Sequence, residues 1–365
     1  MPPPVQIDVE TASRAYQVHV GAGLVQQIER LVSAAGASGQ RFVISSPPIW
    51  KLHGGAVEQA LPGARVLLMP DGERAKTLQT VNRLFEALIE QGADRGATIV
   101  AVGGGVVGDV AGFAAATFLR GVRLAHVPTT LLAQVDSAIG GKVGVNHALG
   151  KNLIGAFHQP IVVVADPVVL ETLPRREFRA GLYEVVKYGV IASRDLFDRV
   201  DRDLTAIFQR RLEALVPVIG ESCRIKAEVV AADERESGLR RILNFGHTVG
   251  HAIEAVSEYR RYRHGEAVGY GMLAAADIAV ARGMLSKADF SALAGLITKL
   301  GPLPPVGDLS ASEIAAAIRR DKKVLAGRLH MVLPTRLGET VIVDDVTGDE
   351  IRAALRSLGI RDAAS

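Results

Sequence analysis

The chain has 365 residues, of which 48% are hydrophobic and 22% charged, with a formal net charge of +3. The composition is ordinary for a globular protein, the length suffices for two domains, and the small positive excess suits an anionic small-molecule substrate without arguing for nucleic acid. Cys223 is the only cysteine and no apolar run reaches membrane-spanning length, so we expect a cytoplasmic protein with no internal disulfide and no membrane span.

The first half of the chain alternates short apolar runs with helical patterns. Residues 5–10 and 15–20 alternate apolar and polar side chains and predict a β-hairpin. Further strands are predicted at 41–45, 65–69, 97–102, 122–127 and 161–165. A helix is expected after Pro47-Pro48 and another at 78–91, with Thr77 as its N-cap. Near-continuous apolar strands between helices indicate a mostly parallel sheet covered on both faces.

The pattern changes near residue 175. Helices are predicted at 176–192, 212–232, 244–257, 266–281, 287–300 and 311–320. Strand signals there are weak and fall at 329–333 and 341–344. We therefore expect an α/β domain over residues 1–175 and a helical domain over 176–365.

A glycine-rich turn, Gly103-x-Gly105-x-x-Gly108, lies between a predicted strand and a predicted helix. Such glycines let a backbone approach a pyrophosphate, whose charge the helix N-terminus stabilises. The turn differs from the usual dinucleotide motif because several strands precede it and no acidic residue follows about twenty positions later. The alternative is a tight turn that needs small residues. We favour phosphate or dinucleotide binding, with Asp109 contacting the nucleotide or capping its helix.

Residues 134–160 are polar, rich in glycine and without a clear period. A long polar segment in a compact domain is usually functional or disordered, and the apolar residues Leu153 and Phe157 argue against disorder. Gly140-Gly141-Lys142 suits a lysine that reaches a phosphate or carboxylate. The alternative is a solvated surface loop.

Three of the nine histidines lie between Arg240 and Glu266. His247 and His251 are four residues apart and share one face of a helix, while His264 opens the next helical run. Converging imidazoles suit a Zn²⁺-type site, and the alternative is a capped helix with polar surface histidines.

Glu184 and Lys187 are spaced i, i+3 among apolar neighbours. Their spacing alone favours a surface ion pair over a metal-binding glutamate beside an anion-binding lysine.

Ten segments occur in an order that resembles the 3-dehydroquinate synthase family of sugar-phosphate cyclases. They span residues 70–325, most of the chain. They include Asp71-Gly-Glu73, Gly103-Gly-Gly-Val-Val-Gly-Asp109, Phe118-Leu-Arg120, Pro128-Thr-Thr130, Asp136-Ser-Ala-Ile-Gly-Gly-Lys142, Gly150-Lys-Asn152, Gly181-Leu-Tyr-Glu184-Val-Val-Lys187, Asn244-Phe-Gly-His247, His264-Gly-Glu266 and Asp321-Lys-Lys323.

The resemblance implies a Rossmann-like α/β NAD-binding domain followed by a helical metal- and substrate-binding domain. It assigns one divalent metal, Zn²⁺ or Co²⁺, to Glu184, His247 and His264, and gives His251 a role in proton transfer. It places NAD at Asp71, Gly72, Glu73, Lys76, Gly104, Gly105, Val106, Val107, Gly108, Asp109, Thr129, Thr130, Lys142, Lys151, Val169 and Thr172. It places the substrate at Arg120, Asp136, Lys142, Asn152, Lys187, Lys226, Arg240, Asn244 and one of Lys322 or Lys323.

The implied reaction converts 3-deoxy-D-arabino-heptulosonate 7-phosphate to 3-dehydroquinate and phosphate in the shikimate pathway. NAD transiently oxidises the substrate, phosphate is eliminated, NADH returns the hydride, and the ring opens and recloses by an intramolecular aldol step. The carboxylate and phosphate of this substrate suit the many lysines and arginines. A homodimer is implied as well. The competing interpretations are another sugar-phosphate cyclase, a metal-dependent polyol dehydrogenase, and a non-catalytic nucleotide-binding module.

Overall fold

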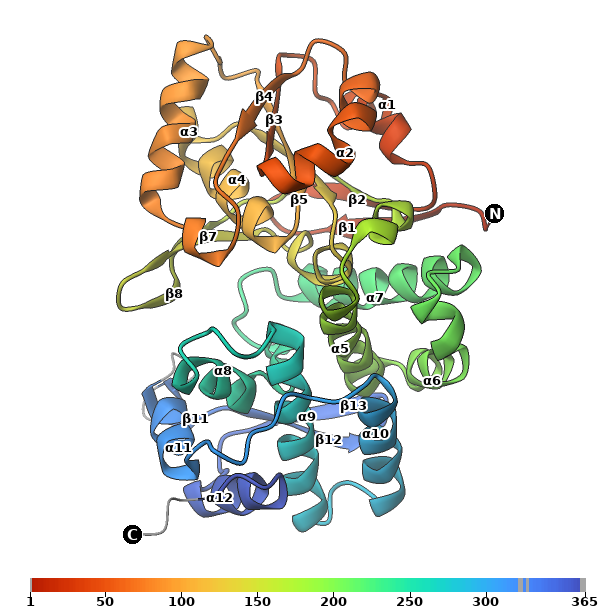
Figure 1. Cartoon of the computed structure of the whole chain (residues 1–365), viewed down its shortest axis with the longest axis vertical. Coiled ribbons are helices and arrows are strands. Elements are labelled where there is room, and N and C mark those ends of the chain that lie inside the picture. The colour runs from red at the N-terminus through yellow and green to blue at the C-terminus, as the bar shows by residue number, and fades with distance from the viewer. Residues whose placement is uncertain (1, 321–323, 326–327, 362–365) are drawn as a thin grey trace. The chain divides into compact units, whose positions relative to one another are not determined.

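The computed structural model describes residues 2–320, 324–325 and 328–361. The described residues divide into two compact units (Figure 1). The first unit contains Met1–Phe178 and Ala206–Arg235, and the second contains Arg179–Thr205 and Glu236–Ser365. Residues 206–235 thus join the α/β part of the chain. The functional division into 1–175 and 176–365 stays a prediction.

In the described part of the first unit, seven strands form one sheet in the order β1-β2-β9-β6-β5-β3-β4. The strands are β1 (Val5–Glu10), β2 (Ala15–Val20), β3 (Arg41–Ser45), β4 (Arg65–Leu68), β5 (Thr98–Gly103), β6 (Arg123–Pro128) and β9 (Val162–Ala165). Strands β1 and β2 are antiparallel, as predicted, and the other neighbours are parallel. The mostly parallel sheet is confirmed.

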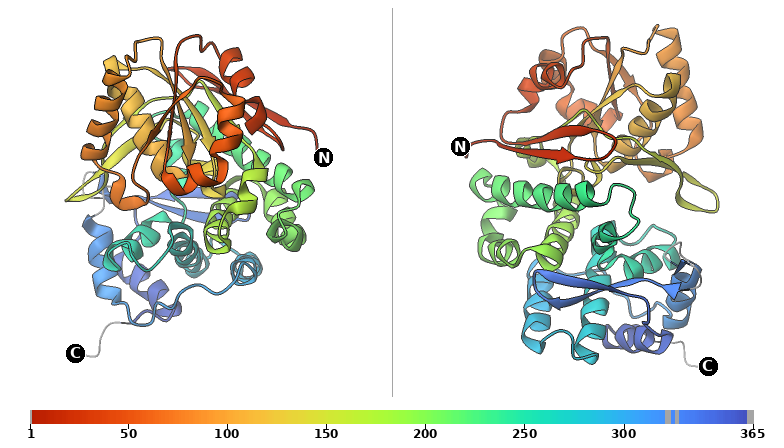
Figure 2. Two further views of the ribbon diagram at one scale, coloured as in Figure 1. Left: turned by 45° about the horizontal axis from the view of Figure 1, so that its top comes forward. Right: turned by 180° about the vertical axis from the view of Figure 1, so that it is seen from behind.

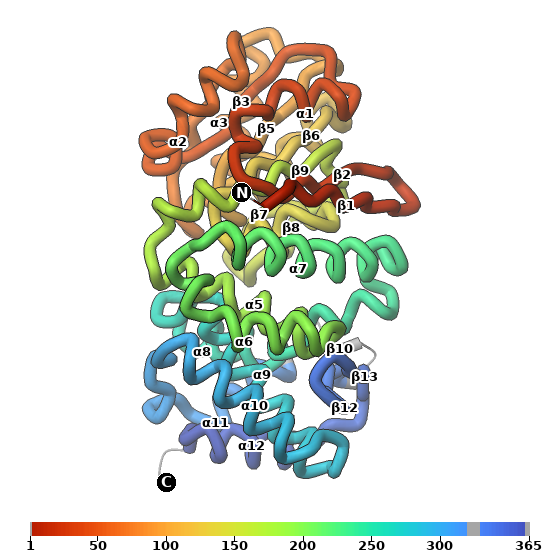
Figure 3. The backbone as a smooth tube through the Cα atoms, turned by 90° about the vertical axis from the view of Figure 1, so that its right-hand side faces the viewer, coloured from red at the N-terminus to blue at the C-terminus, as the bar shows by residue number. Residues whose placement is uncertain are grey.

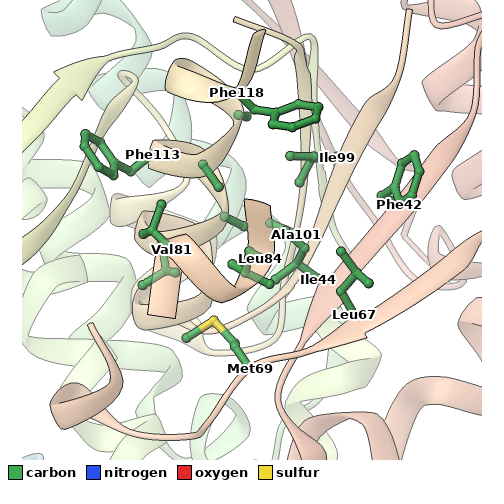
Figure 4. Close-up of a cluster of buried hydrophobic side chains, with 14 of the residues drawn as sticks. Phe42, Ile44, Leu67, Met69, Val81, Leu84, Ile99, Ala101, Phe113 and Phe118 are labelled. Carbon is green, nitrogen blue, oxygen red and sulfur yellow. The ribbon is translucent and has the colours of Figure 1, made fainter. Parts of the chain in front are cut away.

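Helices cover both faces of this sheet. They are α1 (Ile28–Ala34), α2 (Pro47–Ala60), α3 (Leu78–Glu90) and α4 (Gly105–Thr117). Ile99 and Ala101 of β5 pack with α3 and α4 (Figure 4), whereas Val100 and Val102 pack with α1 and α2 on the other face. Every residue of β5 is buried, which explains its continuous apolar run. Thr77 accepts a hydrogen bond from the Thr80 N–H and caps α3, as predicted.

Most of the polar segment 134–160, in which we found no clear period, forms a β-hairpin. It consists of β7 (Lys142–His147) and β8 (Gly150–Phe157) and extends from the α/β body (Figure 1). Gly144 lies opposite Gly155, and a Cβ on Gly144 would lie 2.5 Å from the Ile154 carbonyl oxygen. Paired glycines let the two backbones approach closely, but they interrupt the alternation of side chains by which a strand is identified.

The remaining helix of the first unit is α7 (Leu212–Ala232), which packs along the β1–β2 hairpin (Figures 2 and 3). Two helices each contain a boundary between the two units. They are α5 (Arg175–Ala192) and α6 (Arg194–Phe208), of which α6 was not predicted.

In the second unit, the described residues form α8 (His247–Val256), α9 (His264–Ala281), α10 (Lys287–Lys299), α11 (Ala311–Arg320) and α12 (Gly348–Ser357). Two antiparallel ribbons accompany them, β10 (Val324–Leu325) with β11 (Arg328–Leu329) and β12 (Met331–Arg336) with β13 (Glu339–Val343). Helix α8 begins three residues later than predicted because Leu239–Asn244 forms a 3₁₀ segment and Gly246 adopts a φ of 77°. Helix α12 was not predicted. None of the described helices is both long and apolar enough to cross a membrane.

Candidate active site

The connections of the sheet mark one edge as a place for a ligand. The chain passes from β3 outward to β4, and then from β5 to β6 on the other side of β3. Neighbouring strands whose connections diverge form a topological switch point, beyond whose carboxyl ends open α/β sheets bind ligands. The glycine turn follows β5 at this edge. The Ser45 hydroxyl at the end of β3 donates to the Val102 carbonyl at 2.8 Å.

Two kinds of requirement explain the glycines of the turn. A Cβ on Gly103 would lie 2.5 Å from Val107 Cβ, and one on Gly104 would lie 3.0 Å from Thr130 Cγ2. Close packing therefore requires small residues there. Gly104 is also the N-cap of α4 without a side-chain cap, so the first N–H groups of this 13-residue helix face the end of the sheet. Phosphate binding by Gly104, Gly105, Val106, Val107 and Gly108 stays a prediction.

Lys76 contacts two other predicted site residues. Its buried ammonium group contacts the Asp109 carboxylate and donates to the Asn152 side-chain oxygen. Burial raises the pKa of Asp109 above its usual value, although Lys76 acts in the opposite direction. Asp109 lies inside α4, whose N-cap is Gly104, so the interpretation of Asp109 as a capping residue is wrong.

The loop before α3 contacts the β7–β8 hairpin. Glu73 Oε1 accepts from Asn146 Nδ2 at 2.8 Å and lies 4.0 Å from Lys151 Nζ. Asp71, at the start of this loop with Gly72, accepts from the Ser46 hydroxyl at 3.0 Å. The structure therefore brings the predicted nucleotide residues Glu73 and Lys151 together.

Thr129 and Thr130 follow β6. The Thr129 N–H donates to the Gly103 carbonyl at 2.9 Å, which fixes the two strand ends to each other. The Thr130 hydroxyl accepts from the Ala133 N–H at 3.1 Å. Both threonines thus lie beside the glycine turn, as a nucleotide site there requires.

The remaining nucleotide residues lie after β9. Val169 is buried in the core beside α1 and α2. The Thr172 hydroxyl donates to the Val169 carbonyl at 3.0 Å and lies 3.1 Å from His53 Nε2. Of these two, Thr172 is the exposed residue.

Asp136 and Lys226 form a second charged pair in the first unit. Asp136 belongs to the π-helical segment Ala133–Ser137, a local irregularity that is frequent at functional sites. The buried Lys226 of α7 donates to Asp136 Oδ1 at 2.7 Å and to the Asp136 carbonyl at 2.6 Å. The predicted substrate residues Arg120 and Lys142 of the same unit are exposed, and Arg120 has a φ of 69°.

Histidines and a glutamate converge in the second unit. Glu184 of α5 is fully buried, and its Oε1 lies 3.5 Å from Nε2 of both His247 and His264. His247 and His264 are the first residues of α8 and α9. The ligand atoms of His247, His251 and His264 lie within 4.8 Å of one another. The alternative of polar surface histidines is wrong for His247, which is buried.

The donor set fits a divalent metal. Two ligand atoms that each lie 2.0–2.1 Å from a tetrahedral Zn²⁺ are about 3.4 Å apart, close to the separation of Glu184 Oε1 from each Nε2. Carboxylate and imidazole ligands serve Zn²⁺ and Co²⁺ alike. Glu184, His247 and His264 therefore match the predicted ligand set in type and spacing, and their assignment as ligands stays a prediction.

Hydrogen bonds on the far side of two rings direct Nε2 toward Glu184. His247 Nδ1 lies 3.0 Å from the Phe245 carbonyl, which as a pure acceptor fixes the proton on Nδ1. His264 Nδ1 lies 3.1 Å from Glu254 Oε2. Burial alone would lower the pKa of His264, but Glu254 and Glu184 outweigh it and raise that pKa to about 10.

Glu254 is a functional candidate that the sequence reasoning missed. It is buried on α8 with its carboxylate against His264, the arrangement in which a second carboxylate orients a metal-binding histidine. A glutamate within the apolar run Ala252-Ile253-Glu254-Ala255-Val256 was the available signal.

Glycines bring the helices that carry these groups close together. A Cβ on Gly265 would lie 1.9 Å from the Ala180 carbonyl oxygen of α5, and one on Gly271 would lie 1.7 Å from the Gly246 carbonyl oxygen. The buried Glu266 accepts from Arg179 Nη2 at 3.0 Å and thereby joins α9 to α5. The positions of the histidines thus depend on backbone contact that a larger residue would prevent.

Lys187 lies on α5 beside Glu184. Its ammonium group contacts Glu184 Oε2, and both side chains are at most 1% exposed. The interpretation of these two residues as a surface ion pair is therefore wrong. A buried carboxylate–ammonium pair of this kind is costly to desolvate and is consistent with a functional role.

Two further substrate candidates precede α8. Arg240 is buried at 2% exposure, and Asn244 Nδ2 donates to Glu236 Oε1 at 2.7 Å. Lys322 and Lys323 lie outside the described residues.

Solved structures with this fold identify the class of protein. The 2-epi-5-epi-valiolone synthase of Streptomyces hygroscopicus, bound to NAD⁺ and Zn²⁺, is 30% identical with a TM-score of 0.85, over 94% of this chain and 96% of that one. A 2-deoxy-scyllo-inosose synthase complexed with carbaglucose-6-phosphate, NAD⁺ and Co²⁺ is 31% identical with a TM-score of 0.86, over 97% of this chain and 99% of that one. The fold is that of the sugar-phosphate cyclases.

Sequence comparisons then distinguish within this class. Residues 66–180 match the family model described as 3-dehydroquinate synthase N-terminal, and residues 181–324 match the one described as 3-dehydroquinate synthase C-terminal. A 3-dehydroquinate synthase of Solibacter usitatus is 44% identical over 351 residues, which cover 96% of this chain and 98% of that protein. The chain belongs to the 3-dehydroquinate synthase family.

Proposed function

We propose that this chain converts 3-deoxy-D-arabino-heptulosonate 7-phosphate to 3-dehydroquinate and phosphate, a step of the shikimate pathway, with NAD and one divalent metal. The observation that carries the proposal is the buried Glu184 carboxylate facing Nε2 of His247 and His264, in a chain whose relative at 44% identity is a 3-dehydroquinate synthase. The reaction makes the enzyme a carbon–oxygen lyase.

Glu184, His247 and His264 hold the metal, and three protein ligands leave positions for the substrate. When bound, the metal supplies Lewis-acid polarisation of the substrate hydroxyl that is oxidised, while NAD accepts the hydride and later returns it. The buried ammonium group of Lys187 contacts Glu184 Oε2 and orients the carboxylate beside the two histidines. His251, one turn from His247 with ring centroids 5.3 Å apart, handles a proton of the substrate.

Cationic and amide side chains of each unit are candidates for binding the carboxylate or the phosphate of the substrate. In the first unit these are Arg120, Lys142, Asn152 and Lys226, the last oriented by Asp136 through the bond at 2.7 Å. In the second unit they are Lys187, Arg240 and Asn244. Lys322 or Lys323 completes the set. An uncharged polyol would not need so many cations, which weighs against the dehydrogenase interpretation.

NAD binds in the first unit at the carboxyl edge of the sheet. The N-terminus of α4 with Gly104 and Gly105 receives the pyrophosphate. Glu73 and Lys76 contact the adenosine end. Because the hydride is taken up and given back at the same site, the reaction has no net consumption of NAD.

Three finer features belong to the proposal. Either Zn²⁺ or Co²⁺ serves as the metal, since one related cyclase structure contains Zn²⁺ and another contains Co²⁺. The enzyme works in the cytoplasm, and it is a homodimer. Size-exclusion chromatography with light scattering tests the dimer, and metal analysis of protein purified without added metal tests the ion.

One assay tests the function against its rivals. Purified protein is incubated with the heptulosonate phosphate, a catalytic amount of NAD and Zn²⁺ or Co²⁺, and phosphate and NADH are measured together. Phosphate released in excess over NAD, without accumulation of NADH, supports the proposal. Steady formation of NADH with a polyol indicates a dehydrogenase. Turnover of a different sugar phosphate, or of none, overturns the proposed substrate.

A further inference from the structure

Asn146 of strand β7 connects residues that the proposed function assigns to different ligands. Its side-chain Nδ2 donates to Glu73 Oε1 at 2.8 Å, in the loop assigned to NAD. Its Oδ1 accepts at 3.0 Å from the N–H of Asn152, a residue assigned to the substrate. Its own N–H donates to the Lys76 carbonyl at 2.9 Å. The two ends of one amide and the backbone beside it thus contact three candidate site residues.

Asn152 adopts a backbone conformation that few residues other than glycine favour. Its φ is 53°, in the left-handed region, where asparagine is among the better tolerated side chains. Two bonds hold it there. Its N–H donates to Asn146, and its side-chain oxygen accepts from the Lys76 ammonium group. The direction in which Asn152 presents its amide therefore depends on Asn146 and Lys76.

Lys76 contacts both asparagines and also a residue of α4. Its ammonium group contacts Asp109 of α4 as well as Asn152, and its carbonyl accepts from Asn146. Glu73 and Lys76 are nucleotide residues in the proposed function, and the family resemblance places Asp109 there as well, whereas Asn152 is a substrate residue. A nucleotide that engages Glu73 or Lys76 acts on the same side chains that hold Asn152.

We infer that Asn146 is a positioning residue that couples nucleotide binding to substrate binding by holding the hairpin residue Asn152 on the Glu73–Lys76 loop. The inference rests on the proposed function. Coupling of this kind is reciprocal, so each ligand raises the affinity for the other by the same factor. The factor is therefore measurable from either ligand.

The test measures the dissociation constant of NADH by its fluorescence, with and without saturating heptulosonate phosphate, on the full-length Zn²⁺-loaded protein. NADH allows no oxidation of the substrate, so the complex does not turn over. We expect the heptulosonate phosphate to lower the dissociation constant about tenfold in the unaltered protein, equivalent to about 1.4 kcal/mol. In Asn146→Ala the ratio falls below twofold.

Asn146→Asp separates the two halves of the amide. An aspartate oxygen still accepts from the Asn152 N–H, but it donates nothing to Glu73 and repels its carboxylate. We expect the affinity for the heptulosonate phosphate alone, measured by calorimetry, to stay within twofold, while the coupling ratio falls as in Asn146→Ala. The matched control is Asn82→Ala on α3, which removes an exposed hydrogen bond to Glu86 at 2.7 Å and keeps the tenfold ratio.

The outcomes separate this inference from the proposed function. Unaltered protein that binds both ligands with no coupling overturns the role of Asn146 while the function stands. A tenfold ratio retained in both Asn146 variants overturns it as well. Unaltered protein that binds neither NADH nor the heptulosonate phosphate overturns the proposed function, and the inference with it. A lower affinity for each ligand with an unchanged ratio identifies Asn146 as merely structural.

Discussion

Replacing Glu254 measures how strongly a carboxylate behind His264 supports metal binding. Glu254 is 5% exposed and its Oε2 lies 3.1 Å from His264 Nδ1, while Nε2 of the same ring lies 3.5 Å from Glu184 Oε1. Removing such a partner lowers metal affinity by about 10- to 100-fold, equivalent to about 1.4–2.7 kcal/mol. We expect Glu254→Ala to lie in this range.

Glu254→Gln distinguishes charge from hydrogen bonding. The glutamine oxygen still accepts from His264 Nδ1, so orientation persists while the negative charge that raises the basicity of Nε2 is lost. We therefore expect a smaller loss of metal affinity than in Glu254→Ala. Competition with a chromophoric chelator gives the dissociation constant for Zn²⁺, and the visible absorption spectrum of the Co²⁺ protein reports the ligand geometry without any turnover.

The control is Glu258→Gln, two residues after α8. Glu258 is exposed and pairs with Arg260 at 3.1 Å, so its loss leaves metal affinity unchanged. Equal affinities, within twofold, for the unaltered protein and both Glu254 variants would refute the reasoning, because they would show that His264 is oriented without Glu254.

Three further changes test other parts of the structure. Glu184→Gln removes a metal ligand, so we expect bound Zn²⁺ to be lost in equilibrium dialysis and phosphate release to stop, while the circular dichroism spectrum stays folded. Gly265→Ala places a methyl group 1.9 Å from the Ala180 carbonyl oxygen, and we expect a loss of about 2 kcal/mol or more in the free energy of unfolding, measured with denaturant on metal-free protein. His126→Gln removes a buried imidazole whose pKa is lowered, by burial and then by His158, from 6.5 to about 4. Below pH 6.5 His126 binds a proton in the unfolded chain, but in the folded chain it does so only near pH 4. The free energy of unfolding therefore falls by about 3 kcal/mol between these pH values, at about 1.4 kcal/mol per pH unit. We expect His126→Gln to lack this part of the decrease.

Each of these expectations has an outcome that contradicts it. Full metal content in Glu184→Gln removes Glu184 from the ligand set. The control for Gly265→Ala is Gly55→Ala on α2, where a Cβ meets nothing within 4 Å. A free energy of unfolding that is unchanged in both variants shows that α9 and α5 move apart without loss of stability. Free energies of unfolding that fall equally between pH 7 and pH 4 in His126→Gln and the unaltered protein assign the acid sensitivity to other groups.

The strands of the first unit were predictable because burial on both faces leaves a clear signal. Residues 98–103 are all buried and read as an apolar run, and residues 162–165 behave in the same way. The β7–β8 hairpin was not predictable from periodicity, since Gly144 and Gly155 stand where alternating side chains would be read. Helix α12 was missed although Thr347 and Glu350 form a capping box at its start.

The candidate metal centre shows which part of a site a linear pattern contains. The spacing of His247 and His251 indicates a shared helix face, and their rings do lie 5.3 Å apart. Spacing gives no information about Glu184, because Glu184 and His247 are far apart in sequence and only the packing of α5 against other helices brings them together. The resemblance to a known family supplied that residue. Glu254 was supplied by neither, because its role depends on a contact with His264 across the turn between α8 and α9.

A readable signal for such a centre exists in the residues beside the histidines. Gly246 precedes His247 and Gly265 follows His264, and each glycine lies where a helix of the same unit leaves no room for a Cβ. A Cβ added to Gly246 would lie 2.9 Å from the Val268 carbonyl oxygen of α9, and one added to Gly265 would lie 1.9 Å from the Ala180 carbonyl oxygen of α5. Imidazoles at the first residue of two helices reach a common carboxylate only if those helix ends approach closely. In this chain a glycine beside a histidine at a helix start thus accompanies both the close helix packing and a candidate ligand, whereas the histidine pair at i, i+4 indicates a shared face alone.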